Sequence, residues 1–350
     1  MKSKIYLKTV LSLVIIMLIL IGGVNFAIDP LFQYHKPWFG LEPVITNERY
    51  QNPGIAKNFD YENVIIGNSL SENFKISDVE SVFGGETVKL TASGSHTNDW
   101  VYLLDIIKNK SDTTDNILFN LDPYILRYSS KELKHEIPAY LYNQSYFDDV
   151  KYLFNFSIMK DFTYNILNKN MNNDIPEYDT AFCVDHVAEN HVGKEFVLSN
   201  YERPQITNYN KDNQLLEVAN NNIDLLIPYI ESMPDTEFNF FISPFSMVFW
   251  DNEVRTGNLA NWEECYLQTI GRLLQYENVT IYFWNDQDML DRMSDLNNYC
   301  DEAHYTMEMC EYMTVKMSVG SGKLTLDDYK KEVIGFFDFL ETYDYDSLVM

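Results

Sequence analysis

The chain has 350 residues, of which 46% are hydrophobic, and its formal net charge is −26 at pH 7. This length and apolar content are sufficient for one large hydrophobic core or two small ones. So strong a negative charge argues against nucleic acid as a partner, and against an anionic membrane surface as a partner for the bulk of the chain.

The N-terminal segment has the composition of a membrane anchor. Lysines and no acidic residues occupy the first nine positions, and a run of mostly Leu, Ile and Val follows from Val10 to Ala27. Extended back to Ile5, this run is long enough to cross a bilayer as a helix. Because the lysines stay on the inner side, the rest of the chain should face outward. We expect a single uncleaved anchor over residues 1–28; a cleaved signal peptide is the alternative, although no small-residue cleavage site precedes Asp29.

Residues 29–60 are rich in proline and aromatic residues and predict an irregular stalk. Beyond it, short apolar runs alternate with amphipathic segments, which predicts a parallel sheet with right-handed crossovers. The expected strands are Val64–Ile66, Thr87–Thr91, Asn116–Leu121, Glu237–Ile242 and Val279–Trp284. The expected helices are Ile76–Phe83, Asn98–Lys108, Gln214–Met233, Leu259–Tyr276, Asp286–Met293, Thr306–Val319 and Leu326–Leu340. Residues 61–350 should therefore form one α/β domain, a three-layer α/β/α sandwich with a roughly five-stranded, flavodoxin-like parallel sheet.

Residues 123–215 are the least regular part of this domain and predict an insertion. A helix over Asp148–Leu167 is possible by composition, and residues 168–213 hold many Asn and Asp without a clear period. A loop of this length is typically a lid, a binding insertion or a locally disordered segment, and we expect it to contact the substrate. Cys183, His186 and His191 lie in it, but one cysteine and two histidines without a second cluster do not predict a metal site.

The four cysteines leave two alternatives open. Cys183, Cys265, Cys300 and Cys310 contain no Cys-x-x-Cys pair. In an oxidising location they could form up to two disulfides, one of which could stiffen the loop between Cys300 and Cys310. Free buried thiols are the other alternative.

A candidate nucleophile follows the first strand. The apolar run Val64–Ile66 ends at Gly67, and Asn68 and Ser69 come next. A serine in a turn between a buried strand and a helix exposes its hydroxyl beside backbone N–H groups that have no helical partner. A nucleophile and an oxyanion site need both features. The simpler alternative is a turn that only caps a helix.

A candidate base lies near the other end of the chain. Asp301 precedes His304 by three residues, so its carboxylate can accept the Nδ1–H of the imidazole and leave Nε2 free to take a proton. The pair follows the last predicted strand, and Ser69 follows the first. In a parallel sheet both loops open at the same edge. The alternative is a surface Asp and His at helical spacing.

These blocks resemble the SGNH (GDSL-like) hydrolase superfamily over roughly residues 60–320. Its Gly-Asp-Ser block corresponds to Gly67-Asn68-Ser69, with Asn in place of Asp, and its glycine after strand two corresponds to Gly94. Its Asp-x-x-His block corresponds to Asp301 and His304. The third block, Gly-x-Asn-Asp, is not kept: Asn120 lies one residue out of register, and Asp122 is a poor oxyanion donor unless it is protonated.

The closest resemblance is to membrane-anchored SGNH-like proteins that modify bacterial envelope polymers, including the alginate acetylation and D-alanyl lipoteichoic acid transfer proteins. It implies serine-dependent O-acyl transfer, without a cofactor, by a domain outside a bacterial cell membrane, with a membrane-bound O-acyltransferase and an envelope glycan or teichoic polymer as partners. The expected catalytic residues are Ser69, His304 and Asp301; the expected oxyanion donors are Ser69, Gly94 and, out of register, Asn120; and the expected substrate-binding residues are His96, Asp122 and Ser243. A surface O-acetyl esterase and a non-catalytic polymer-binding scaffold are the alternatives.

Overall fold

The structure, a computed structural model, describes residues 2–110, 114–129, 135–145, 147–183, 191–209 and 213–349. The chain divides into two compact units. Unit 1 comprises Met1–Asp60 and Glu136–Ala181, and unit 2 comprises Tyr61–His135 and Phe182–Met350. The range expected to be an insertion, residues 123–215, thus contributes to both units.

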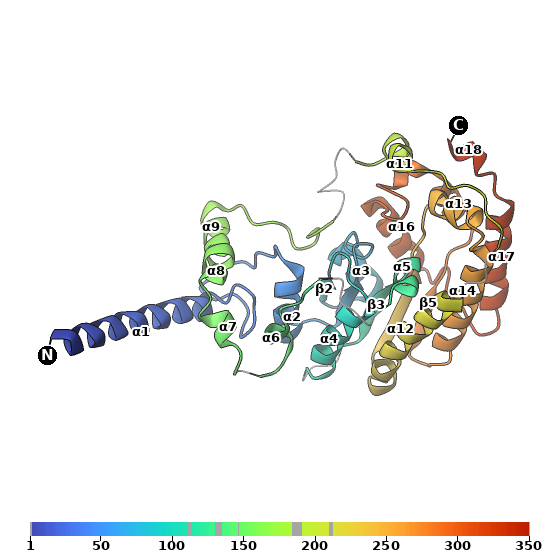
Figure 1. The fold of residues 1–350 in the computed structure, drawn as a ribbon. Helices are drawn as coiled ribbons and strands as arrows, with labels where there is room; N and C mark the ends of the chain where they lie inside the picture. Colours follow the sequence, from blue (N-terminus) through green and yellow to red (C-terminus); the bar gives the residue numbers. More distant parts are fainter. Residues whose placement is uncertain are drawn as a thin grey trace. The chain divides into compact units, whose positions relative to one another are not determined.

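Unit 2 is built on a five-stranded parallel sheet in the order β2-β1-β3-β4-β5 (Figure 1). The strands are β1 (Asn63–Gly67), β2 (Thr87–Thr91), β3 (Asn116–Leu121), β4 (Glu237–Ile242) and β5 (Val279–Tyr282). Three of them have the bounds expected from the sequence, and the predicted α/β class with a five-stranded parallel sheet is confirmed. This strand order belongs to the flavodoxin-like doubly wound folds, whose sites form at the carboxyl ends of the strands.

Nearly all strand residues are buried because helices cover both faces of the sheet. On one face α3 (Ile76–Phe83) packs against α16 (Met307–Ser318). On the other, four helices pack in succession: α4 (Thr97–Lys108), α12 (Asn213–Ser232), α14 (Leu259–Leu273) and α17 (Tyr329–Thr342). The remaining helices of unit 2 are α5 (Pro123–Arg127), α11 (Lys194–Asn200), α13 (Met247–Arg255), α15 (Gln287–Ser294), η2 (Leu296–Asn298) and α18 (Asp346–Val349).

Unit 1 begins with α1 (Lys2–Ile28). Among the described residues, one helix is long and apolar enough to cross a membrane, Lys4–Ile28, with a mean hydropathy of 2.6 over its most apolar window. Length and composition fit a membrane anchor and a signal sequence alike, so the expected location of the chain stays a prediction.

The segment expected to be an irregular stalk contains a helix, α2 (Glu48–Asn58). The Asn47 side chain caps it by accepting from Tyr50 N at 3.2 Å. Buried Gln51 then donates to Pro30 O at 3.0 Å and to Val44 O at 2.8 Å. Tertiary contacts thus support a helix in a proline-rich sequence that gives little local signal for one.

The helix expected over Asp148–Leu167 is divided into pieces: α7 (Val150–Leu153), α8 (Phe156–Ile158), the π-helix η1 (Met159–Thr163) and α9 (Tyr164–Asn172). The break falls at Asn155, whose side chain accepts from Ser157 N at 2.9 Å and so caps a new helix. Unit 1 also contains α6 (Ala139–Tyr142).

The cysteine alternatives are resolved in favour of thiols. Cys183, Cys265, Cys300 and Cys310 are all buried thiols.

Candidate active site

Strand β1 leads directly into the turn that carries Ser69. Gly67 closes the strand where no side chain fits, because a Cβ there would lie 2.1 Å from Ser71 Oγ and 2.2 Å from Asn120 Oδ1. The chain can therefore turn tightly against the end of β3. This places the half-buried Ser69 at the carboxyl edge of the sheet.

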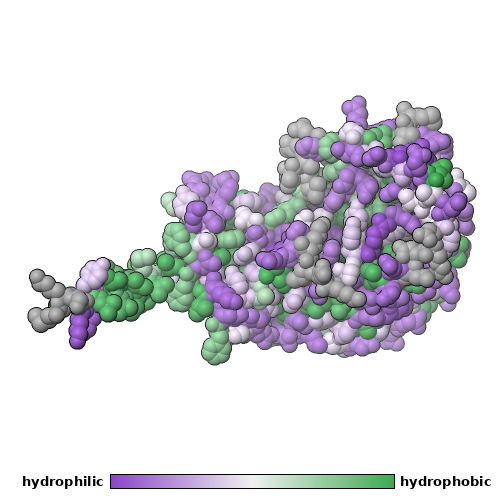
Figure 2. Space-filling view, in the orientation of Figure 1, coloured by the Kyte–Doolittle hydropathy of each residue, from purple (hydrophilic) through white to green (hydrophobic). Residues whose placement is uncertain are grey.

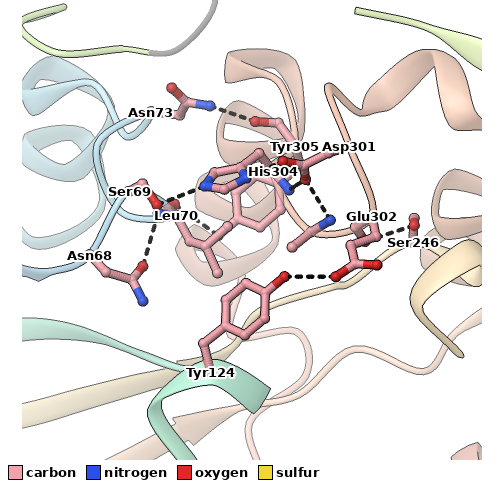
Figure 3. Close-up of polar contacts among 11 residues, drawn as sticks. Asn68, Ser69, Leu70, Asn73, Tyr124, Ser246, Asp301, Glu302, His304 and Tyr305 are labelled. Carbon is pink, nitrogen blue, oxygen red and sulfur yellow. Dashed lines mark hydrogen bonds and ion pairs between the residues drawn. The ribbon is translucent and has the colours of Figure 1, made fainter. Parts of the chain in front are cut away.

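The structure brings Ser69, His304 and Asp301 into one chain of hydrogen bonds (Figure 3). Ser69 Oγ lies 2.7 Å from His304 Nε2, and His304 Nδ1 lies 2.7 Å from Asp301 Oδ2. A carboxylate at Nδ1 selects the tautomer in which Nε2 is an acceptor, so the serine hydroxyl donates to the ring. The order of these contacts is that of a nucleophile, a base and an orienting acid.

Hydrogen bonds close the loop that carries Asp301 and His304 on itself. Asp301 Oδ1 accepts from the backbone N–H groups of Ala303 at 2.8 Å and His304 at 2.7 Å. Cys300 N donates to His304 O at 2.8 Å, and Tyr299 and Tyr305 form an antiparallel bridge around the loop. One carboxylate oxygen thus shapes the loop while the other orients the imidazole.

Tyr305 connects the two halves of the site, and sequence reasoning missed it. Its buried hydroxyl donates to Leu70 O at 2.9 Å, one residue after the serine. Asn73, from the same turn as Ser69, donates its side-chain amide to Tyr305 O. The position of Tyr305 directly after His304 was the one available signal.

A second set of contacts holds the loop from the other side. Ser246 donates its hydroxyl to Glu302 O at 2.7 Å and its backbone N–H to the same oxygen at 3.1 Å. Tyr124 donates to Glu302 Oε1 at 3.0 Å (Figure 3). Tyr124, Glu302 and Asp301 also line a cavity of about 210 Å³.

Beneath the serine lies a buried network of amides and one carboxylate. Asn68 accepts from Leu70 N at 2.9 Å and donates to Asp122 Oδ2 at 3.0 Å. Asn120 donates to Asn68 Oδ1 at 3.1 Å and to Asp122 Oδ2. Asp122 Oδ1 accepts from Tyr124 N and Ile125 N, capping α5. Asn at position 68 suits this network because an amide can donate to the carboxylate.

Burial raises the pKa of Asp122 to about 6, although the donors around it lower the pKa. Both oxygens of Asp122 accept hydrogen bonds, and these donors favour its ionised form.

The network contains two of the expected site residues, and a third lies beside Tyr305. Asn120, Asp122 and Ser243 are exposed by 0%, 0% and 2%, so their contact with a substrate stays a prediction. In the structure Asn120 and Asp122 hold the serine turn, and the Tyr305 hydroxyl lies 3.5 Å from Ser243 Oγ. His96 is half-buried at the start of α4, where its ring stacks on Tyr128 with centroids 5.5 Å apart.

Two backbone N–H groups near the serine stand without an acceptor among the described residues: those of Ser69 and Gly94. Gly94 adopts a positive φ of 64° in the turn after β2. Pairs of such groups at the carboxyl edge of a sheet can bind a developing oxyanion.

The electrostatics favour a charged pair. Burial lowers the pKa of His304, but the hydrogen bond and charge of Asp301 outweigh it, so the pKa lies above its ordinary value. Burial raises the pKa of Asp301, and the hydrogen bonds and charge of His304 outweigh it in turn, so that pKa lies below its ordinary value. Both shifts stabilise an imidazolium next to a carboxylate, as a base needs after it has taken a proton.

No cluster of three or more His, Cys, Asp or Glu side chains that could hold a metal is found within the described ranges. Of the residues considered for zinc, His191 contacts the ring of Phe196, Cys183 is a buried thiol, and His186 lies outside the described residues.

Comparison with known proteins gives a distant structural likeness. No protein-family model matches the chain, and no curated protein matches it. A solved structure from Streptococcus pneumonia, described as "a putative platelet activating factor", is similar at 14% identity and a TM-score of 0.37, covering 78% of this chain and 89% of that one.

Proposed function

We propose that this chain is a serine-dependent acyl-group enzyme in which Ser69 is the nucleophile, His304 the general base and Asp301 the orienting acid. The single observation that carries the proposal is the Ser69–His304–Asp301 chain, with both contacts at 2.7 Å. Residues far apart in the sequence meet there in the order and geometry that acyl transfer requires.

In the first half-reaction, Ser69 Oγ attacks the carbonyl carbon of an ester while His304 Nε2 takes the hydroxyl proton. The N–H groups of Ser69 and Gly94 stabilise the negative oxygen of the tetrahedral intermediate. As the intermediate collapses, His304 returns the proton to the leaving alkoxide, and the acyl group stays on Ser69. In the second half-reaction His304 deprotonates an acceptor hydroxyl, which attacks the acyl group and restores the serine.

We favour an acceptor alcohol over water, and therefore O-acyl transfer over hydrolysis. The Asn120 amide is committed to Asn68 and Asp122, so the oxyanion site has backbone donors without a side-chain amide. One oxyanion donor is worth on the order of 3 kcal/mol, and an enzyme supplied with an activated acyl group tolerates its loss better than one that cleaves unactivated esters. With the SGNH resemblance and the apolar α1, this favours an envelope glycan or teichoic polymer as acceptor and a membrane-bound O-acyltransferase as donor.

A fluorophosphonate probe tests the nucleophile directly. The wild-type chain should label at Ser69, and S69A and H304A should lose labelling by about 10³-fold or more. S81A is the matched control, because the exposed Ser81 hydroxyl donates within its own helix, to Asp78 O at 2.6 Å. Wild-type protein that folds and does not label would leave the non-catalytic scaffold as the better description.

Hydrolysis is the second candidate, and one observation favours it. The side chains of His304 and Asp301 are 28% and 48% exposed, so water reaches the base. An aryl acetate incubated with and without an envelope glycan separates the two candidates. Transfer predicts acylated glycan at the expense of free acetate, whereas an esterase releases acetate at the same rate in both.

A further inference from the structure

The last turns of α1 are a structural part of unit 1. The Asn25 side chain is completely buried and donates to Leu153 O at 2.9 Å and Asn155 O at 3.2 Å, and Thr163 donates back to it at 3.0 Å. Gly22 packs directly against Phe154, since a Cβ at this position would lie 2.8 Å from the phenylalanine ring. Without α1, the carbonyls of Leu153 and Asn155 would lose these donors.

Three short helices run across the C-terminal end of α1. In Figure 1, α7, α8 and α9 follow one another in a row transverse to the α1 axis. Figure 2 shows apolar surface continuing from α1 onto the adjoining surface of this unit, with hydrophilic surface on either side of it. Exposed apolar side chains at the end of α1, in the segment after it and along α7, α8 and α9 include Phe26 (41%), Trp38 (44%), Val150 (55%), Phe154 (43%), Phe156 (60%) and Tyr164 (66%). We call this set the collar.

The length of α1 determines how deep the collar lies if α1 spans a bilayer. The continuously exposed part, Ile5–Leu20, covers about 24 Å along the helix axis, and its residues are apolar except for Lys8, Thr9 and Ser12. The hydrocarbon layer is about 30 Å thick. The next turn, Gly22–Asn25, must therefore also lie at hydrocarbon depth, and that turn packs on Leu153 and Phe154.

We propose that α1 is retained and that the collar lies in the outer interface of a phospholipid bilayer, so that α7, α8 and α9 rest flat on the membrane in contact with lipid. The chemistry fits this depth. A polar residue in lipid must have its hydrogen bonds satisfied within the protein, and Asn25 has three. Tryptophan, tyrosine and phenylalanine are the side chains that suit the membrane–water boundary.

Depth-dependent fluorescence on the full-length chain tests this. Phe156→Cys and, as a second site, Val150→Cys are labelled with an environment-sensitive dye and reconstituted into phosphatidylcholine–phosphatidylglycerol vesicles. The native cysteines are buried, so wild type treated with the same dye shows whether labelling is specific for the introduced cysteine. Leu13→Cys is the lipid reference, and Val319→Cys, 75% exposed in unit 2, is the aqueous reference.

Both collar labels should be quenched by lipids that carry a nitroxide near the headgroup, and at least about threefold less by iodide than the label at position 319. Equal iodide quenching at the collar and at position 319 would overturn the proposal. Protection from both quenchers would overturn it too, because protein and not lipid would then cover the collar. The membrane-purified chain should also retain residues 1–28 by intact mass, and loss of this segment would contradict the retained helix.

Discussion

The side-chain amide of Asn68 donates to the buried carboxylate of Asp122 at 3.0 Å, directly beneath the turn that carries Ser69. The residue before the serine and a carboxylate after β3 thus form a hydrogen-bonded pair, in which each side chain satisfies the other. The carboxylate can be ionised there because its neighbours donate to it, and a second carboxylate in place of Asn68 would remove a donor and add a like charge.

The first prediction concerns this pair. Asn68→Asp should destabilise unit 2 by about 2–4 kcal/mol, because a buried donor becomes an acceptor beside a charged acceptor. Chemical denaturation at pH 7 measures the loss. The double variant Asn68→Asp/Asp122→Asn reverses the polarity of the pair and should recover much of the stability. Equal stabilities of the single and double variants would show that the two side chains do not interact.

The second prediction concerns the end of β1. Gly67→Ala should cost about 3 kcal/mol and lower activity, because the new methyl group meets Ser71 and Asn120 in a packed turn. Gly335→Ala is the matched control: a Cβ there meets nothing within 4 Å, and alanine is the better helix former by about 1 kcal/mol. Thermal unfolding of both variants should therefore shift in opposite directions. Equal destabilisation would mean that the close approach at Gly67 is not what requires glycine.

The third prediction is a pH profile. His304 must be neutral to act as a base, and its pKa lies above the ordinary 6.5, so the rate should rise with pH through a midpoint above 6.5. Asp301→Asn removes the main cause of the rise in pKa, so the midpoint should move to lower pH while the maximal rate falls about 10³-fold to 10⁴-fold. Titration of the His304 ring by NMR gives the same shift without an activity assay. An unchanged pKa of the His304 ring in the variant would show that Asp301 does not act on this imidazole.

The same shifts give the sign of the pH dependence of stability. The folded-state pKa of His304 is raised, so its stabilising contribution is complete below 6.5 and is lost as pH rises through the folded pKa. The folded-state pKa of Asp301 is lowered, so its contribution is present above 3.8 and is lost as pH falls through the folded pKa. The pair should therefore stabilise the fold most between these two ordinary values.

The fourth prediction separates positioning from packing. Tyr305 and Tyr299 are both buried, and each donates its hydroxyl to a backbone carbonyl, Leu70 O at 2.9 Å and Pro244 O at 2.7 Å respectively. Tyr305→Phe and Tyr299→Phe should each cost about 1 kcal/mol of stability. Only Tyr305→Phe loosens the link between the serine turn and the histidine loop, so it alone should lower kcat, with little change in KM. The same fall in kcat in both variants would assign Tyr305 a purely structural role.

The sequence by itself determined the elements whose signals are local. Short segments rich in apolar residues, with Gly, Pro or Asp soon after them, predicted β2, β3 and β4 at their observed bounds, because buried parallel strands need apolar side chains on both faces. The same reading paired Ser69 with His304, since loops after parallel strands share one edge of the sheet. No local pattern, however, indicated α2 in its proline-rich setting.

Only the tertiary structure decided what lies beneath and beside those two residues. Asn120 and Asp122 became supports of the turn because folding buried them against Asn68, and burial of a side chain depends on residues distant in the sequence. Tyr305 became a link for the same reason, since its partner Leu70 is 235 residues away. Periodicity indicates which face of an element is apolar, whereas hydrogen bonds between loops exist only once the sheet has brought those loops together.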